Sequence, residues 1–358
     1  MSKYISFLLI FMIIKTSAQI NKQQLIDNWA IVKYSTLDGS RDLSQDSGHF
    51  SIWKLSDNKI CEYVNPIFEE RKTCYDIKIE NKSIRTSPKT FYEIEKLTND
   101  TLIIIERLDG ITGNDKIKKK WFVRTSKLQN EYLSTLKNDT AVVASAYFTP
   151  TLKKDIFFDV LERSVTNNDR NLSVKGNIII YPKKQKINFQ FESNDQSKKN
   201  SENIDFLKSI VEKSYQFWNL TGFEKYDQII LPYHIETQIR NNDGSKSSSM
   251  SFNFFKNDRK DLDKYQNRAI VIIENKKLAA EAYNKAMEAL DKKKLDRAIE
   301  LFNKAFDLNN TNVDALYNAA SISLDKKDMP TACTALKKLK DFEQVEGTKL
   351  FNELCLKN

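Results

Sequence analysis

The feature that most constrains the fold of this chain is a degenerate 34-residue repeat near its C-terminus. Helix-turn-helix units of this period cannot bury their apolar faces alone, and they do so by stacking on one another. Small and aliphatic residues recur in register, so residues 276–356 are predicted to form a stack of paired helices. The matched positions are Ala282, Ala286, Ala298 and Phe302 in the first unit, and Leu316, Ala320, Ala332 and Leu336 in the second.

The apolar periodicity of this region is typical of a family of helical repeats. Leu295, Ala298, Ile299 and Phe302 fall on one stripe of a helix, and alanines on its partner allow close approach. The pattern resembles tetratricopeptide repeats (TPR), and that resemblance implies a surface that binds other polypeptides. The expected helices are 279–291, 295–308, 313–325 and 329–341, with a closing helix over 346–356.

The end of the repeat region carries two cysteines. Thr331-Ala332-Cys333 stands in the last unit, and Cys355 stands in the closing helix. This arrangement resembles a variant found in exported Bacteroidota proteins. The resemblance implies a crosslink that clamps the closing helix onto the stack.

The N-terminus has the pattern of an export signal. Lys3 supplies a positive charge, Tyr4 to Ile14 are apolar, and Thr16-Ser17-Ala18 forms a small-residue cleavage site. Residues 1–18 are therefore predicted to be a signal peptide, with a buried N-terminal helix as the alternative. The apolar stretch is too short for a permanent span, and no later segment approaches spanning length, so no integral membrane span is expected after cleavage.

An even number of cysteines suits an oxidising compartment. Cys61 with Cys74 and Cys333 with Cys355 form two local pairs, each inside one predicted domain. Two disulfides are predicted, with free thiols as the alternative. No metal site is expected, because His49 and His234 lie far from any cysteine in the sequence.

Residues 22–127 have the pattern of an antiparallel β-barrel. Short runs of β-branched and aromatic residues alternate with turns such as Asn81-Lys82 and Asn99-Asp100. Eight short strands in about a hundred residues favour closure, which removes exposed edges. The expected strands are 29–37, 48–55, 58–64, 72–79, 82–86, 89–97, 101–107 and 118–125.

Three stretches of this region resemble the small lipocalin-like domains of exported Bacteroidota proteins. They are Leu25-Ile26-Asp27-Asn28-Trp29, Asp38-Gly39 and the run from Tyr92 to Leu102. The resemblance implies that Trp29 plugs the barrel floor. A barrel of this size is either filled by its own side chains or holds one small ligand, and the sequence leaves both open.

The middle of the chain divides into an unassigned piece and a second α+β domain. Residues 128–171 are treated as a linker of uncertain structure, in which 141–148 suits either a strand or a helix. Residues 172–256 follow a ββαββ pattern, with strands over 174–181, 186–192, 228–239 and 248–255 and a helix that carries Ile204, Leu207, Ile210, Val211 and Tyr215.

This second domain resembles the C-terminal domain of TonB-type proteins. The resemblance rests on Gly176, a helix ending near Trp218, and Gly222 followed by the run 229–235. It implies that an extended peptide can add to an open sheet edge. The candidate edge comprises Ser248, Met250, Phe252 and Phe254, with a hairpin strand that binds nothing as the alternative. His234 is expected to be a structural histidine.

Charge and motifs argue against several functions. The formal net charge is +9, but lysines are interspersed with acids, so no nucleic-acid partner is expected. Lys118-Lys119-Lys120 and Lys292-Lys293-Lys294 are interpreted as solvated surface. Only two histidines are present and no nucleophile, phosphate-loop or dinucleotide motif occurs, so neither catalysis nor a cofactor is expected.

Together these patterns predict an exported, periplasmic or secreted, multidomain α+β protein: an N-terminal antiparallel β-barrel, a central ββαββ domain and C-terminal α-helical TPR-like repeats. The predicted function is a non-enzymatic adaptor that binds other envelope proteins or peptides through its TPR-like and TonB-like surfaces. The alternatives are a carrier of a small apolar ligand in the barrel, or an accessory of TonB-dependent transport. No pattern predicts an oligomeric state.

Overall fold

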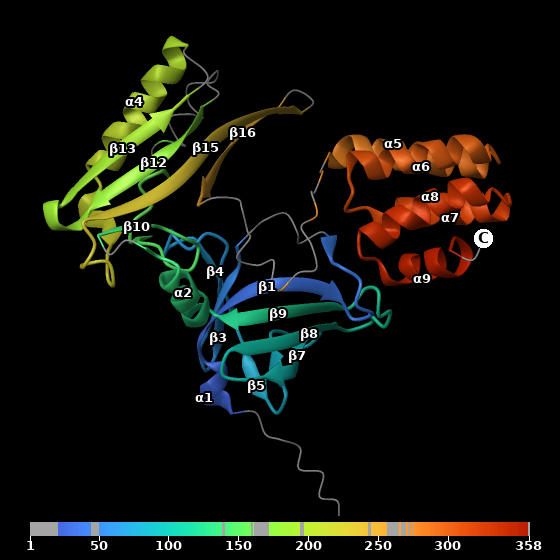
Figure 1. Ribbon diagram of the computed structural model, residues 1–358, viewed down its shortest axis with the longest axis horizontal. Coiled ribbons are helices and arrows are strands. Elements are labelled where there is room, and N and C mark those ends of the chain that lie inside the picture. The colour runs from blue at the N-terminus through green and yellow to red at the C-terminus, as the bar shows by residue number, and fades with distance from the viewer. Residues whose placement is uncertain are drawn as a thin grey trace, which may run out of the picture.

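The chain folds into a barrel, a second sheet and a helical stack (Figure 1). The computed structural model describes residues 21–43, 50–137, 140–158, 160, 172–193, 197–242, 245–255, 265, 270, 273 and 275–356. The predicted signal peptide, residues 1–18, lies outside the described residues. The mixed α+β class and the order of its parts agree with the sequence-based expectation.

The N-terminal part is a nine-stranded antiparallel sheet that curls into a nearly closed barrel. Sequential strands pair except β4 and β5, and the last strand pairs with the first, as in an up-and-down meander. The strands are β1 (Asn28–Thr36), β2 (Ile52–Leu55), β3 (Lys59–Tyr63), β4 (Lys72–Asp76), β5 (Lys78–Glu80), β6 (Ser83–Arg85), β7 (Thr90–Leu97), β8 (Thr101–Leu108) and β9 (Lys118–Arg124).

The barrel closes through a bend in the chain. β4 pairs with β3, whereas β5 pairs with β6, and Ile77 alone separates the two. The Ile77 N–H donates to the Asn58 carbonyl oxygen at 2.8 Å. The segment expected as one strand over 72–79 is therefore two short strands, because its halves pair with different neighbours.

One end of the barrel is sealed by apolar side chains. Trp29 is fully buried, and its indole N–H donates to the Leu25 carbonyl oxygen at 2.8 Å, at the end of α1 (Lys22–Leu25). This agrees with the expected plugging role of Trp29. Outside the barrel, Leu128 of α2 (Thr125–Ser134) packs on Val32 and Val123, so β1 and β9 are covered on both faces here.

A second sheet lies at the centre of the chain. Its strand order is β10-β15-β12-β13, and β16 also pairs with β15. β12 and β13 approach closely at Gly176, where a Cβ atom would lie 2.0 Å from the Gln190 carbonyl oxygen. The elements are β10 (Ala141–Val143), β11 (Thr151–Leu152), β12 (Ser173–Tyr181), η2 (Pro182–Lys184), β13 (Lys186–Glu192), α4 (Lys198–Glu212), η3 (Tyr215–Phe217), β14 (Trp218–Asn219), β15 (Gln228–Asn242) and β16 (Ser245–Phe254).

Part of the segment left unassigned by the sequence packs with this second sheet. β10 pairs in parallel with the start of β15, whereas β11 pairs with β14 in a separate two-stranded sheet. Val142, Phe148 and Phe157 are buried in the same core as the sheet. The end of this segment, residues 161–171, lies outside the described residues.

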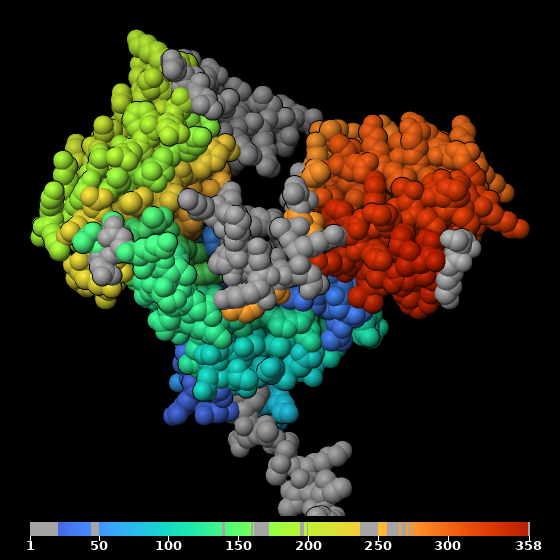
Figure 2. Space-filling view, viewed as in Figure 1, coloured from blue at the N-terminus to red at the C-terminus, as the bar shows by residue number. Residues whose placement is uncertain are grey.

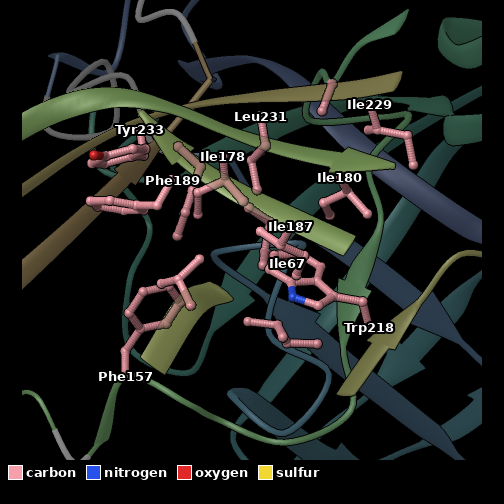
Figure 3. Close-up of a cluster of buried hydrophobic side chains, with 14 of the residues drawn as sticks. Ile67, Phe157, Ile178, Ile180, Ile187, Phe189, Trp218, Ile229, Leu231 and Tyr233 are labelled. Atoms are coloured by element: carbon pink, nitrogen blue, oxygen red, sulfur yellow. The ribbon is translucent and has the colours of Figure 1, made fainter. Parts of the chain in front are cut away.

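The loop between β3 and β4 inserts into the core of the second sheet. Ile67 and Phe68 are fully buried there, and Ile67 faces the sheet residues in Figure 3. The Phe68 ring contacts Phe157 and Phe254 with centroids 5.8 Å away in each case. The Leu152 N–H donates to the Ile67 carbonyl oxygen at 2.6 Å. The barrel therefore contributes this loop to the core of the second sheet, while its own strands enclose a separate buried cluster.

The C-terminal part contains five helices over 275–356, and its backbone repeats every 34 residues. Lys293 and Lys327 have φ of 56° and 60° at equivalent turns. The Lys294 N–H bonds the Ala289 carbonyl oxygen, and the Asp328 N–H bonds that of Ser323 in the same way. The helices are α5 (Lys276–Asp291), α6 (Leu295–Leu308), α7 (Val313–Asp325), α8 (Met329–Asp341) and α9 (Val345–Leu354).

The helical stack docks on the β1–β2 connection of the barrel, which lies beneath the stack in Figure 2. The Arg41 N–H donates to the Glu343 carbonyl oxygen at 3.1 Å. The Gln344 amide donates to the Arg41 carbonyl oxygen at 3.1 Å, and the Val345 N–H donates to Ser40 Oγ at 3.0 Å. These bonds hold the turn between α8 and α9 against the barrel.

We expect Phe68→Ala to destabilise the barrel and the second sheet together. Phe68 is 1% exposed, and loss of a buried Phe ring costs about 3–5 kcal/mol. Urea unfolding followed by tryptophan fluorescence measures the change. The matched control is Phe158→Ala, which removes a ring that is 60% exposed and should leave the unfolding free energy almost unchanged. Equal unfolding curves for the two variants would contradict this role of Phe68 in the core of the second sheet.

We expect Glu69 to make the packing of the β3–β4 loop on the second sheet sensitive to acid. The Thr151 hydroxyl bonds Glu69 Oε1, and the Asn219 amide donates to the same oxygen at 3.3 Å. The hydrogen bond from Thr151 does most to hold the pKa of Glu69 below its usual range. Asn219, Lys153 and Lys72 lower this pKa further, whereas burial raises it. Because the pKa of Glu69 is lower in the folded protein than the unfolded value of about 4.3, the ionised carboxylate stabilises the fold above about pH 4.3. This stability is lost as the pH falls through the pKa of the folded state.

Glu69→Gln should therefore be less stable than the wild type at pH 7, by about 1 kcal/mol or less, and the gap should narrow toward pH 3. Urea unfolding across this pH range is the measurement. The control is Glu70→Gln, at the exposed neighbouring position, which should show no such convergence. A gap for Glu69→Gln that stays constant with pH would refute the role of the carboxylate.

Candidate functional site

The end of the barrel opposite Trp29 contains a cavity of about 330 Å³. Its lining comes from β2, β3, β4, β7, β9 and the β6–β7 turn, so strands from around the barrel contribute. We call this the barrel mouth, and it comprises Trp53, Ile60, Glu62, Tyr75, Thr86, Ser87, Thr90, Tyr92 and Lys120.

The strand register explains why polar and aromatic residues face inward here. Trp53 pairs with Glu62 across β2 and β3, and Tyr92 pairs with Glu106 across β7 and β8. Residues directly opposite one another in an antiparallel pair lie on the same face of the sheet. Lys120 pairs with Ile104, a fully buried core residue, and therefore also points inward. The barrel is thus apolar toward its floor and polar toward its mouth.

A charged pair lies inside the barrel mouth. Lys120 Nζ is 3.0 Å from Glu106 Oε2, and the Lys120 side chain is only 15% exposed. The same ammonium lies 5.3 Å from the centroid of the Trp53 ring and 5.4 Å from that of Tyr92. A partly buried ammonium is stabilised here by one carboxylate and two aromatic faces.

Lys120 corrects an interpretation of the sequence. The run Lys118-Lys119-Lys120 was expected to be solvated surface, but alternate residues of a strand point to opposite faces. Lys119 lies on the outer face, where its ammonium is 2.6 Å from Glu95, while Lys120 lies in the cavity. Strand alternation in the sequence indicates that neighbouring lysines face opposite sides, but only the pairing register shows which lysine faces inward.

Trp53 contributes a hydrogen-bond donor with no partner. It is 3% exposed, and its ring lies 5.1 Å from Tyr92 and 4.8 Å from Phe122 between centroids. Its indole Nε1 is buried and makes no hydrogen bond within the described part of the chain. An unpaired buried donor costs about 1–3 kcal/mol of folding free energy.

The electrostatic environment of the barrel mouth is negative. The Ser51 hydroxyl donates to Glu62 Oε1 at 2.5 Å, which holds that carboxylate in place. Burial raises the pKa of the Tyr92 hydroxyl, and the charges of Glu106 and Glu62 raise it further. Tyr92 therefore stays protonated at any physiological pH, and its hydroxyl remains a hydrogen-bond donor.

The structure places the predicted sheet edge on β16. Because the Phe255 N–H bonds the Pro232 carbonyl oxygen, alternation turns the backbone groups of the four candidate residues away from β15. Part of this edge is occupied, since the Asn65 amide lies 3.4 Å from the Phe252 carbonyl oxygen. Phe254 is buried, Phe252 and Met250 are half-buried, and Ser248 pairs with Ile239. Peptide addition at this edge stays a prediction.

A smaller cavity of about 180 Å³ lies between α5 and α6. Leu278 at its rim is 47% exposed, whereas Ala282 and Leu301 at its base are buried. Lys285, Arg297, Lys304 and Glu281 surround it, so bases outnumber acids at this first helical pair. We call this site the α5–α6 groove.

Both predicted disulfides are present. Cys61 and Cys74 face each other directly across β3 and β4, at the base of the loop that carries Phe68. Cys333 of α8 is joined to Cys355 at the end of α9, as the resemblance implied. Both bonds are compatible with an exported protein.

Other expectations concern histidine, metals and membranes. His234 Nε2 lies 2.9 Å from Glu236 Oε1 along β15, and no group of three or more potential metal ligands occurs in the described ranges. His49 lies outside them. None of the helices that the structure describes has the length and apolar character that a bilayer span requires.

Comparison with known proteins assigns no relative: no family model matches the chain, and no curated protein and no solved structure gives a match. The argument for function therefore rests on the geometry of the barrel mouth and the helical stack. Of the residues that form the barrel mouth, the sequence singled out none as a site, because their common feature is a cross-strand register rather than a local motif.

Proposed function

We propose that this is an exported binding protein whose barrel mouth holds one small molecule. The observation that carries the proposal is the cavity of about 330 Å³ at one end of the barrel, which aromatic and polar side chains line together. Pockets for small molecules combine apolar and aromatic walls with a few placed polar groups, and their volumes begin at about 300 Å³. The barrel mouth has this composition.

The lining favours a ligand that is amphipathic rather than purely apolar. Tyr75 and Trp53 offer aromatic surface, while Glu62, Lys120 and three hydroxyl residues offer polar groups. This departs from the apolar ligand that the sequence suggested as an alternative. The proposal is one of binding rather than catalysis, in keeping with the lack of a nucleophile–base motif in the sequence.

We expect Trp53→Phe to weaken ligand binding. The wild type is screened against small amphipathic metabolites by ligand-observed NMR, and dissociation constants are then measured by calorimetry. The smaller ring offers less aromatic surface to the ligand, a loss of about 0.5–1.5 kcal/mol that should weaken binding about two- to tenfold. The folded protein should be no less stable, because the substitution removes an unpaired donor.

The control for that measurement is Trp121→Phe. Trp121 is the neighbour of Lys120 on β9 and lies on the outer face of the barrel, beneath Lys33 and Lys119. Its replacement should leave the affinity unchanged. Failure of every compound to bind the wild type, or equal affinity in both variants, would overturn the proposal.

A second candidate function is the adaptor role predicted from the TPR-like pattern. The observation that favours it is the α5–α6 groove, in which an exposed leucine stands beside buried alanine and leucine and is surrounded by lysine and arginine. Such a surface suits an apolar polypeptide segment flanked by acidic residues. The resemblance to the TonB C-terminal domain adds the outward half of β16 as a further candidate contact.

We expect Leu278→Glu to abolish polypeptide capture, because it places a charge of the partner's sign at the apolar rim. Immobilised full-length protein is incubated with an envelope extract, and bound proteins are quantified by mass spectrometry. The control is Met287→Glu, at another exposed apolar position of α5, where the side chain is 39% exposed. Equal retention of the same proteins by both variants would count against the adaptor role. So would a wild type that retains no protein.

A further inference from the structure

The charges of the barrel mouth do not balance. Glu62 and Glu106 supply two carboxylates, and Lys120 supplies one ammonium. Lys120 and Glu106 neutralise each other at 3.0 Å, which leaves the negative charge of Glu62 beside the cavity. A carboxylate in a partly buried site repels anions and attracts cations more strongly than it would in water.

Three aromatic rings border the same space. Trp53 and Tyr92 pack against each other, and Tyr75 of β4 also lines the cavity. The faces of aromatic rings carry partial negative charge and attract ammonium groups within about 6 Å. The chain already uses two of these rings in this way, since the Lys120 ammonium lies over Trp53 and Tyr92. A site that stabilises its own ammonium has the chemistry to hold another.

We propose that the ligand of the barrel mouth is a small organic cation, an amine or a quaternary ammonium, that also carries a hydrogen-bond acceptor. This inference rests on the proposed binding function of the cavity. The cationic group lies near Glu62 and Tyr75, and the acceptor receives a hydrogen bond from the hydroxyl group of Tyr92, which also lines the cavity. Binding thereby satisfies the unmatched negative charge.

An anionic ligand fits the site less well. Among the described residues that line the cavity, Lys120 is the only cation, and Glu106 already holds it. An anion would have to break this pair and leave Glu106 without its partner while lying beside Glu62. Removal of one partner from a buried ion pair is costly, so this arrangement is disfavoured.

Three probes of nearly the same shape separate the ligand classes. Choline is a cation with a hydroxyl group, 3,3-dimethylbutan-1-ol is its neutral isostere, and 3,3-dimethylbutanoate is an anion of similar size. Affinities for the full-length protein are measured by ligand-observed NMR titration. Choline should bind about three- to thirtyfold more tightly than the neutral alcohol, and the anion should bind more weakly than both.

Two charge variants test the assignment with opposite signs. Glu62→Gln should weaken choline binding about three- to tenfold and leave the neutral alcohol within about twofold. Lys120→Met should tighten choline binding, because it removes a competing ammonium from Trp53 and Tyr92. The controls are Glu95→Gln and Lys119→Met, which change the same residue types on the outer face of the barrel. Should Lys120→Met fail to fold, the isosteres and Glu62→Gln decide.

The outcomes separate this inference from the function on which it rests. If the neutral alcohol or the anion binds most tightly, and Trp53→Phe weakens that binding, the cation assignment is overturned while small-molecule binding at the barrel mouth stands. Equal affinity of wild type and Glu62→Gln for choline would also overturn it. Absence of binding for all three probes and for every compound of the metabolite screen would overturn both.

Discussion

The packing of Ile67 and Phe68 into the second sheet is the interaction on which the arrangement of the barrel depends. The loop that carries them leaves the barrel between β3 and β4, and both side chains are removed from water only in the core of the other sheet. The Cys61–Cys74 bond closes the base of this loop, which limits the conformations of its ends before it docks. Arg71 extends the contact by pairing with Asp155 at 2.5 Å.

The same end of the barrel carries the docking loops and the cavity. In an up-and-down meander, alternate connections emerge at one end. Because β4 and β5 are the two halves of one bent strand, the β1–β2, β3–β4 and β6–β7 connections lie together. The first contacts the helical stack, the second enters the second sheet, and the third lines the barrel mouth. Binding sites on connections at one end of a rigid scaffold are common, because the strands fix their geometry.

The Lys120–Glu106 pair supports a functional interpretation of this end. Replacing a buried ion pair by apolar residues is often neutral or stabilising, so such a pair is weak evidence for a role in stability. The opposite end of the same barrel shows the alternative, with Trp29, Leu102 and Phe122 closing it by apolar packing. The chain therefore fills one half of the barrel with a conventional core and keeps charge and an unpaired indole in the other half.

The helical stack uses crosslinking and docking where a longer solenoid would use more repeats. Stacks of this kind usually need three or more units. Here α9 packs closely on α8 at Gly347, where a Cβ atom would lie 2.4 Å from Leu339 Cβ, and the Cys333–Cys355 bond holds the two helices together. The turn before α9 then bonds Ser40 and Arg41 of the barrel, so the last unit is supported from two sides.

Local sequence determined the elements whose interactions are close in the chain. The 34-residue repeat located the C-terminal helices to within a few residues, and the alternation of apolar residues located the barrel strands, because each depends on neighbours a few positions away. The two disulfides followed from local cysteine pairs. Tertiary structure alone decided the rest: β10 gains its partner from β15 some ninety residues later, Phe68 finds its core outside the barrel, and Lys120 faces the cavity only because β8 and β9 pair in one register. The barrel mouth belongs to this second group, since its residues come from five strands and a turn that share no local pattern and meet only when the barrel closes.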